Sequence, residues 1–224
     1  MDLEDILLHI FMVGKQHKMP EFKAHNLWPT PIYESEIPVK DEWKNTIVNF
    51  EYERTHVNNS DISKDRNILN SIPDLKQEIE KHCEIFVRKY LIVKDNAKFY
   101  LQNSWSNIHK PNEFSQIHKH GNSLISGVYY PIFPINSGNI SFHHKDSIPS
   151  NLFPPSIMIE FDEHNNLNAG MYYIEIQEGT IVLFPSHLEH KVQENKSNEK
   201  RYSIAFNFFV RGKFGKEEYI LEIK

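Results

Sequence analysis

Residues 178–185 read EGTIVLFP, a turn signal followed by an apolar run that ends at a proline. A short apolar run bounded by turn residues predicts a buried β-strand, here over 180–185. Similar patterns fill the second half of the chain, and we expect further strands at 97–108, 115–120, 123–133, 138–144, 156–161, 171–178, 201–210 and 217–223. Many short strands in succession indicate a jelly roll (double-stranded β-helix), which is two packed antiparallel sheets.

The first half of the chain has a different pattern, in which apolar residues recur at helical spacing. This spacing predicts helices at about 3–11, 40–54 and 73–91, the last of them opened by Pro73. Residues 27–33, LWPTPIY, carry two prolines and predict an extended edge strand instead. The expected fold is therefore mainly β with N-terminal helices, a jelly roll backed by helices.

The composition suits one folded domain. A chain of 224 residues that is 39% hydrophobic can bury a sizeable core. We expect a single domain over 1–224, with a helical support region at 1–95 and the jelly-roll core at 96–224. The only cysteine, Cys83, excludes an internal disulfide framework and fits a reducing, cytoplasmic location.

Charge and hydropathy limit the classes of partner. A net charge of −5 argues against nucleic acid as the main partner, because binding phosphates requires a basic face. No apolar run approaches the roughly 20 residues that a membrane span requires.

Three histidines have the spacing of metal ligands. His118 and His120 alternate along a predicted strand, so both rings project from one face, ~7 Å apart along the chain. His190 follows the strand at 180–185 and can reach the same mouth of the jelly roll. Three imidazoles on one face of an ion leave three octahedral positions open, as in the non-haem iron sites that bind a chelating cosubstrate and O2.

An arginine and a hydroxyl follow the third histidine. Arg201 and Ser203 alternate on the next predicted strand, and Asn207 shares their side. A guanidinium binds a carboxylate through two hydrogen bonds, and a nearby hydroxyl adds a third donor. This set suits a small dicarboxylate; the other interpretation of Arg201 is an ordinary surface salt bridge.

Together these segments resemble the 2-oxoglutarate/Fe(II) oxygenases of bacteria and bacteriophages, over about residues 26–210. The pieces that carry the resemblance, in order, are LWPTPIY at 27–33, NSWSN at 103–107, HKH at 118–120, SGVYY at 126–130, LFPS at 183–186 through His190, and RYSIAFN at 201–207. The resemblance implies a double-stranded β-helix that binds Fe(II) and 2-oxoglutarate. It also implies that the enzyme oxidises its substrate, by hydroxylation, with release of succinate and CO2.

The resemblance also assigns roles to residues. It implies that His118 and His190 are iron ligands and that Arg201 and Ser203 hold the distal carboxylate of 2-oxoglutarate. Asn107 stands where related oxygenases place a polar group that touches the cosubstrate. No acid or base beyond the metal ligands is expected.

His120 departs from the family pattern, because most members have Asp or Glu at this position. A third histidine would leave the iron with one more positive charge and weaken its selectivity over Zn(II) or Ni(II). We expect His120 to ligate the metal; the alternative is a supporting role, with water at that position. A side chain of this size leaves no room for chloride, so we do not expect halogenation.

Several alternatives stay open at this point. A cupin-like metal enzyme without a keto acid, or a jelly roll that only binds, would also contain histidines. His187 competes with His190 as the third ligand. The segment at 145–168 is either a lid or a long excursion, and the substrate, a small molecule or a protein side chain, is not specified.

Overall fold

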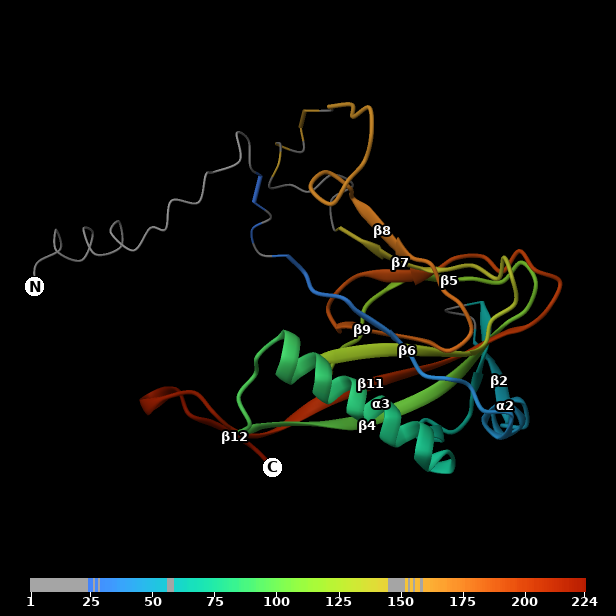
Figure 1. The fold of residues 1–224 in the computed structure, drawn as a ribbon, viewed down its shortest axis with the longest axis horizontal. Coiled ribbons are helices and arrows are strands. Elements are labelled where there is room, and N and C mark those ends of the chain that lie inside the picture. The colour runs from blue at the N-terminus through green and yellow to red at the C-terminus, as the bar shows by residue number, and fades with distance from the viewer. Residues whose placement is uncertain are drawn as a thin grey trace, which may run out of the picture.

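Two antiparallel sheets face one another, and helices cover the outer face of the larger one (Figure 1). The computed structural model describes residues 24–25, 27, 29–55, 59–144, 152, 154, 156–157 and 159–224. The helix expected at 3–11 lies outside these residues. The two-layered arrangement confirms the jelly roll that the strand pattern predicts.

The larger sheet has eight strands. In spatial order they are β1 (Tyr33–Glu36), β9 (Thr180–Pro185), β6 (Ile125–Ile132), β11 (Arg201–Phe214), β4 (Ala97–His109), β3 (Ser60–Ser63) and β2 (Tyr52–Thr55), with β12 (Leu221–Ile223) paired to β11. The smaller sheet has the order β5 (Ser115–His118), β10 (His190–Val192), β7 (Ile140–His143) and β8 (Met171–Ile174).

Alternate residues of strand β11 face opposite sides of the larger sheet. Its even-numbered residues Ile204, Phe206 and Phe208 are buried in the core beneath the helices. The odd-numbered Arg201 and Ser203 alternate with them, so they project toward the smaller sheet. The space between the two sheets is therefore lined by polar as well as apolar side chains.

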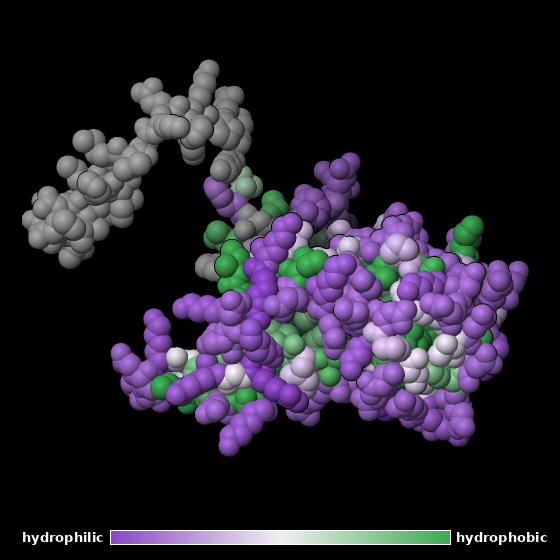
Figure 2. Space-filling view, turned by 60° about the horizontal axis from the view of Figure 1, so that its bottom comes forward, coloured by the Kyte–Doolittle hydropathy of each residue, from purple (hydrophilic) through white to green (hydrophobic). Residues whose placement is uncertain are grey.

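The helices bury one face each. Helix α3 (Pro73–Ile85) starts with proline and places Leu75, Ile79 and Cys83 in the core, and a π-helical turn, η2 (Phe86–Tyr90), extends it. Helix α2 (Asp41–Val48) buries Trp43 and Ile47. No helix of the described residues is long and apolar enough to cross a membrane. Hydrophilic residues cover most of the face in Figure 2, and hydrophobic ones show between them in several separate places.

Some expected elements differ from the structure. The helix predicted at 40–54 ends at Val48, because residues 52–55 pair with β3 and Tyr52 donates to the Ser106 hydroxyl across the sheet. Residues 156–157 and 159–161 form no strand. Short connectors also complete the fold: the 3-10 turns η1 (Ile68–Ser71) and η3 (Glu217–Tyr219) precede α3 and β12.

Candidate metal centre

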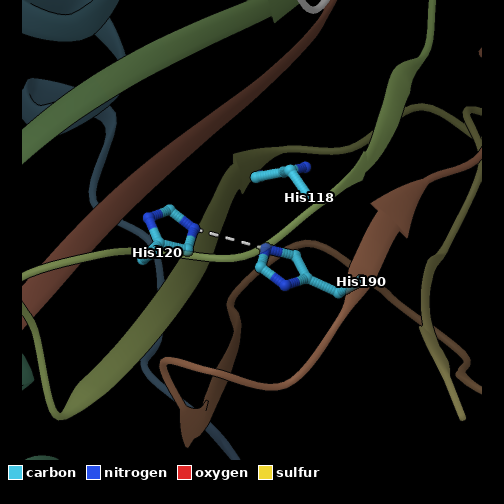
Figure 3. Close-up of side chains that lie close together, drawn as sticks. All are labelled: His118, His120 and His190. Carbon is cyan, nitrogen blue, oxygen red and sulfur yellow. Dashed lines mark hydrogen bonds between the residues drawn. The ribbon is translucent and has the colours of Figure 1, made fainter. Parts of the chain in front are cut away.

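Three histidine rings converge between the sheets (Figure 3). His118 ends β5, His120 follows it by two residues, and His190 opens β10 directly opposite His118 in the ladder. One ring nitrogen from each lies within 4.8 Å of the others. The sequence therefore predicted which histidines meet, and the exposed His187 is not in this group.

Backbone carbonyls orient two of the rings. His118 Nδ1 lies 2.8 Å from the carbonyl oxygen of Gln116, and His190 Nδ1 lies 2.9 Å from that of Leu188. A carbonyl only accepts, so each Nδ1 carries the proton and each Nε2 keeps its lone pair. Metal-binding histidines generally have such a partner on the ring nitrogen that faces away from the metal.

His120 completes the group from outside the strand. Its backbone N–H donates to the carbonyl of Ser186 at 2.9 Å, and its Nε2 lies 3.3 Å from His190 Nε2. The Trp105 ring packs at 5.7 Å from its ring. Since His190 Nδ1 carries the proton, His120 Nε2–H donates to His190 Nε2, and a cation bound between the three rings would take the place of this hydrogen bond.

Burial keeps two of the three rings neutral, those of His120 and His190. The Phe184 ring lies 4.6 Å from that of His190, and burial, followed by the neighbouring His118, lowers the pKa of His190 to about 3. The same causes lower the pKa of His120 to about 4. Neutral imidazole is the form that binds metal. Three nitrogen donors with no carboxylate in the described group fit Fe(II), Ni(II) or Zn(II).

The inner faces of both sheets lead from this centre to Arg201. On the larger sheet, Asn207 lies level with His190 of the smaller sheet, and Arg201 lies six residues away from Asn207 along β11. The guanidinium also donates to the carbonyl of Gln193, which follows β10 of the smaller sheet and stands three residues or ~10 Å beyond His190. Between Asn207 and Arg201, β11 carries only the small inward side chains of Ala205 and Ser203, which occupy little of the space between the two sheets.

Arg201 is a buried cation with no anionic partner among the described residues. Its Nη1 donates to the carbonyls of Ser137, Gly138 (2.8 Å) and Gln193 (3.4 Å). Its Nε and Nη2 have no partner among the described residues, and its side chain is fully buried. Burial lowers its pKa to about 10, which the neighbouring Tyr130 partly opposes. An unpaired buried charge is costly, and a bound carboxylate would offset that cost.

The other predicted cosubstrate residues share this face. Ser203 pairs with Asn107 in the β11–β4 ladder, and residues directly opposite project to the same side. Ser203 is buried and Asn107 is partly buried. The alternative of a surface salt bridge for Arg201 is wrong, since the side chain is buried and pairs with backbone carbonyls.

Sequence reasoning gave no role to His109, a neighbour of Arg201, and could not decide whether a second neighbour, Tyr130, faces inward. Tyr130 belongs to the inner core, and its hydroxyl is buried without a described partner, as is Nδ1 of His109. Burial raises the pKa of Tyr130. Alternation with Asn107 along β4 was the signal that could have placed His109 on the inner face, whereas the parity of Tyr130 stayed undecided because the sequence did not show whether Gly121 interrupts the strand.

A surface hollow of about 960 Å³ lies beside this region. It is lined by Ser137, Gly138 and Gln193 among others, the same residues whose carbonyls hold Arg201. None of the three histidines lines it. The hollow therefore borders the arginine end and not the metal centre.

Comparison with known proteins agrees with this geometry. Residues 103–207 match a family described as "Putative 2OG-Fe(II) oxygenase", a span that contains the three histidines, Arg201 and Ser203. No match was found among curated proteins.

Solved structures share the fold at low sequence identity. One is a prolyl-4-hydroxylase from Pseudomonas putida, with 14% identity, a TM-score of 0.54, and coverage of 82% of this chain and 94% of that one. Another is HygX from Streptomyces hygroscopicus with nickel and 2-oxoglutarate bound, with 10% identity, a TM-score of 0.54, and coverage of 80% and 82%. A third is a 2OG-Fe(II) oxygenase family oxidoreductase from Burkholderia pseudomallei, with 12% identity, a TM-score of 0.53, and coverage of 75% of each chain. Residues 103–207 of this chain therefore carry the sequence pattern of the 2OG-Fe(II) oxygenase family, on the jelly roll that the solved oxygenases share.

Proposed function

We propose that this protein is a 2-oxoglutarate- and Fe(II)-dependent dioxygenase that hydroxylates a substrate. The observation that carries the proposal is the fully buried Arg201, whose Nε and Nη2 have no described partner. Small side chains on β11 separate it from the three converging histidines. A cupin-like enzyme without a keto acid, or a jelly roll that only binds a metal, has no use for this arginine.

The residues divide into two groups. His118, His120 and His190 would hold the iron, Arg201 with Ser203 would hold the far carboxylate of 2-oxoglutarate, and Asn107 would touch the cosubstrate. When bound, the iron supplies the oxidation that converts 2-oxoglutarate and O2 to succinate and CO2 and places the second oxygen atom on the substrate. The protein orients both molecules, and the aromatic rings around His190 exclude water.

The wider assignment follows from the same fold. We extend the proposal to residues 1–224 as a single domain, since α3 packs on the larger sheet and β1–β3 belong to it. The neighbours in fold include a prolyl-4-hydroxylase and a nogalamycin epimerase. A small molecule or a protein side chain is therefore the class of substrate proposed, without nucleic acid or membrane, and in the cytoplasm.

Turnover of 2-oxoglutarate without a substrate tests the proposal. Many enzymes of this chemistry consume the keto acid slowly when alone, so release of CO2 from carboxyl-labelled 2-oxoglutarate can be followed with Fe(II) present. We expect release by the unmodified protein and none by His190→Ala. Release that is equal in the two proteins, or absent while iron is bound and 2-oxoglutarate is saturating, would contradict the proposal.

A further inference from the structure

His109 stands directly opposite Arg201. It is the last residue of β4, it pairs with Arg201 in the ladder, and their side chains therefore share the inner face. Its side chain is 1% exposed, and its Nδ1 has no hydrogen-bond partner among the described residues. Two unpartnered guanidinium nitrogens and an unpartnered imidazole nitrogen thus lie buried on one side of the sheet.

The second nitrogen of the ring is occupied. His109 Nε2 lies 2.9 Å from the Ser115 hydroxyl oxygen. Burial, followed by the charge of Arg201, holds the pKa of His109 well below its usual range, so the ring is neutral and carries one proton. If the Ser115 hydroxyl donates to Nε2, this proton is on Nδ1, and Nδ1–H becomes a donor beside the guanidinium.

We infer that His109 is a cosubstrate-positioning residue: its Nδ1–H joins Arg201 Nε and Nη2 in binding one carboxylate, and Ser115 fixes the tautomer. The inference rests on the proposed function, because the carboxylate is the far one of 2-oxoglutarate. A carboxylate has two oxygens with about four acceptor sites, enough for these three donors. The neutral ring adds one hydrogen-bond donor to those that Arg201 offers the carboxylate, without adding a second buried charge.

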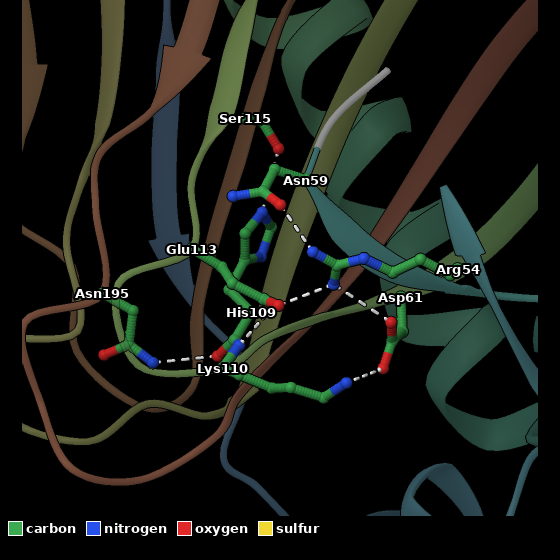
Figure 4. Close-up of polar contacts among 8 residues, drawn as sticks. All are labelled: Arg54, Asn59, Asp61, His109, Lys110, Glu113, Ser115 and Asn195. Carbon is green, nitrogen blue, oxygen red and sulfur yellow. Dashed lines mark hydrogen bonds and ion pairs between the residues drawn. The ribbon is translucent and has the colours of Figure 1, made fainter. Parts of the chain in front are cut away.

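A surrounding network holds His109 and Ser115 in place (Figure 4). The carbonyl of His109 accepts from Asn195 Nδ2 at 2.8 Å. In the turn that follows, the Lys110 N–H donates to a Glu113 carboxylate oxygen at 2.8 Å, and the other oxygen of that carboxylate pairs with Arg54 at 2.6 Å. The turn between the two residues is therefore fixed before any ligand binds, as precise positioning requires.

Two amide substitutions at His109 distinguish the contribution of Nδ1 from that of Nε2. The short amide introduced by His109→Asn would stand near the place of Nδ1, and the longer amide introduced by His109→Gln near that of Nε2, so the two substitutions form a matched pair. Binding of 2-oxoglutarate to the full chain, loaded with Fe(II) without oxygen, is measured by calorimetry. We expect His109→Gln to weaken binding about tenfold, the cost of one charge-assisted hydrogen bond, and His109→Asn to stay within about threefold. Affinity for Fe(II) should not change in either variant.

Two further measurements keep the test independent of how well these variants fold. Ser115→Ala should weaken 2-oxoglutarate binding several-fold, because the tautomer is no longer fixed. In the unmodified protein, the ¹⁵N resonance of His109 should report protonated Nδ1 and should shift when 2-oxoglutarate binds. Unchanged binding in His109→Gln, or a proton on Nε2 in the bound state, would overturn the inference. If the unmodified protein binds no 2-oxoglutarate, or binds it equally well without the Arg201 guanidinium, the proposed function fails instead.

Discussion

At the scale of single residues, the proposed function assigns to Arg201 the binding of the far carboxylate of 2-oxoglutarate. Arg201→Met keeps the length of the side chain and removes the charge and its donors, so we expect 2-oxoglutarate binding to weaken by about 100-fold or more. Arg211→Met is the control, since Arg211 lies on the same strand, is exposed, and packs over the Tyr100 ring. Calorimetry on both Fe(II)-loaded variants gives the comparison, and equal losses would remove Arg201 from the site.

The second prediction at this scale concerns the contribution of His120 to Fe(II) affinity. Its nitrogen lies within reach of the other two ligands, so His120→Ala should lower Fe(II) affinity by at least about tenfold, the lower end of what losing even a supporting group costs. His187→Ala serves as the control because His187 is exposed and outside the group. Anaerobic competition with a chelator measures both. Undiminished affinity in His120→Ala would contradict both a ligand role and a supporting role for this ring.

At the scale of elements, strand β6 has no room for a side chain at Gly127. A Cβ there would stand 2.4 Å from the Phe206 ring and 2.6 Å from a Leu183 methyl carbon. We expect Gly127→Ala to lower the free energy of unfolding by about 1–3 kcal/mol, the cost of overpacking a core. Gly121→Ala meets nothing within 4 Å and should be nearly neutral. Denaturant unfolding of both variants would refute this if they were equally stable.

The same scale shows what could be predicted from the sequence. Long alternating strands such as β4 and β11 carry enough pattern to be found within a residue or two at most ends, and β9 stands between clear turn signals. The short β2–β3 hairpin and β10 do not, because three or four residues hold too little periodicity and depend on pairing with distant strands. The pair His118 and His120 was predictable from its alternate spacing, whereas the choice of His190 over His187 rested on the family resemblance. The roles of His109 and Tyr130 were not, since they depend on which buried atoms lack a partner.

At the scale of the whole molecule, stability should depend on pH through buried histidines. The pKa values of His109, His120 and His190 are all lowered from 6.5, so the unfolded chain binds protons that the folded one does not. Their contribution is complete above pH 6.5 and is lost as the pH falls toward the folded pKa values.

For the metal-free protein we expect the free energy of unfolding to fall between pH 6.5 and about pH 5, by on the order of 1 kcal/mol per pH unit for each such histidine. Carboxylates titrate mainly below this window. Denaturant unfolding across the window measures the slope, which should be shallower in a variant with His120→Gln and His190→Gln. A flat profile would show that the rings are protonated when folded.

The most direct test of the whole account is an anaerobic titration of the metal-free protein, first with Fe(II) and then with 2-oxoglutarate. Chelation of iron by the keto acid produces a weak visible charge-transfer band. We predict a band that requires both additions, saturates at one equivalent of iron, and needs far more 2-oxoglutarate in Arg201→Met. Iron that binds at the histidines without any band, at every concentration of 2-oxoglutarate, would contradict the account.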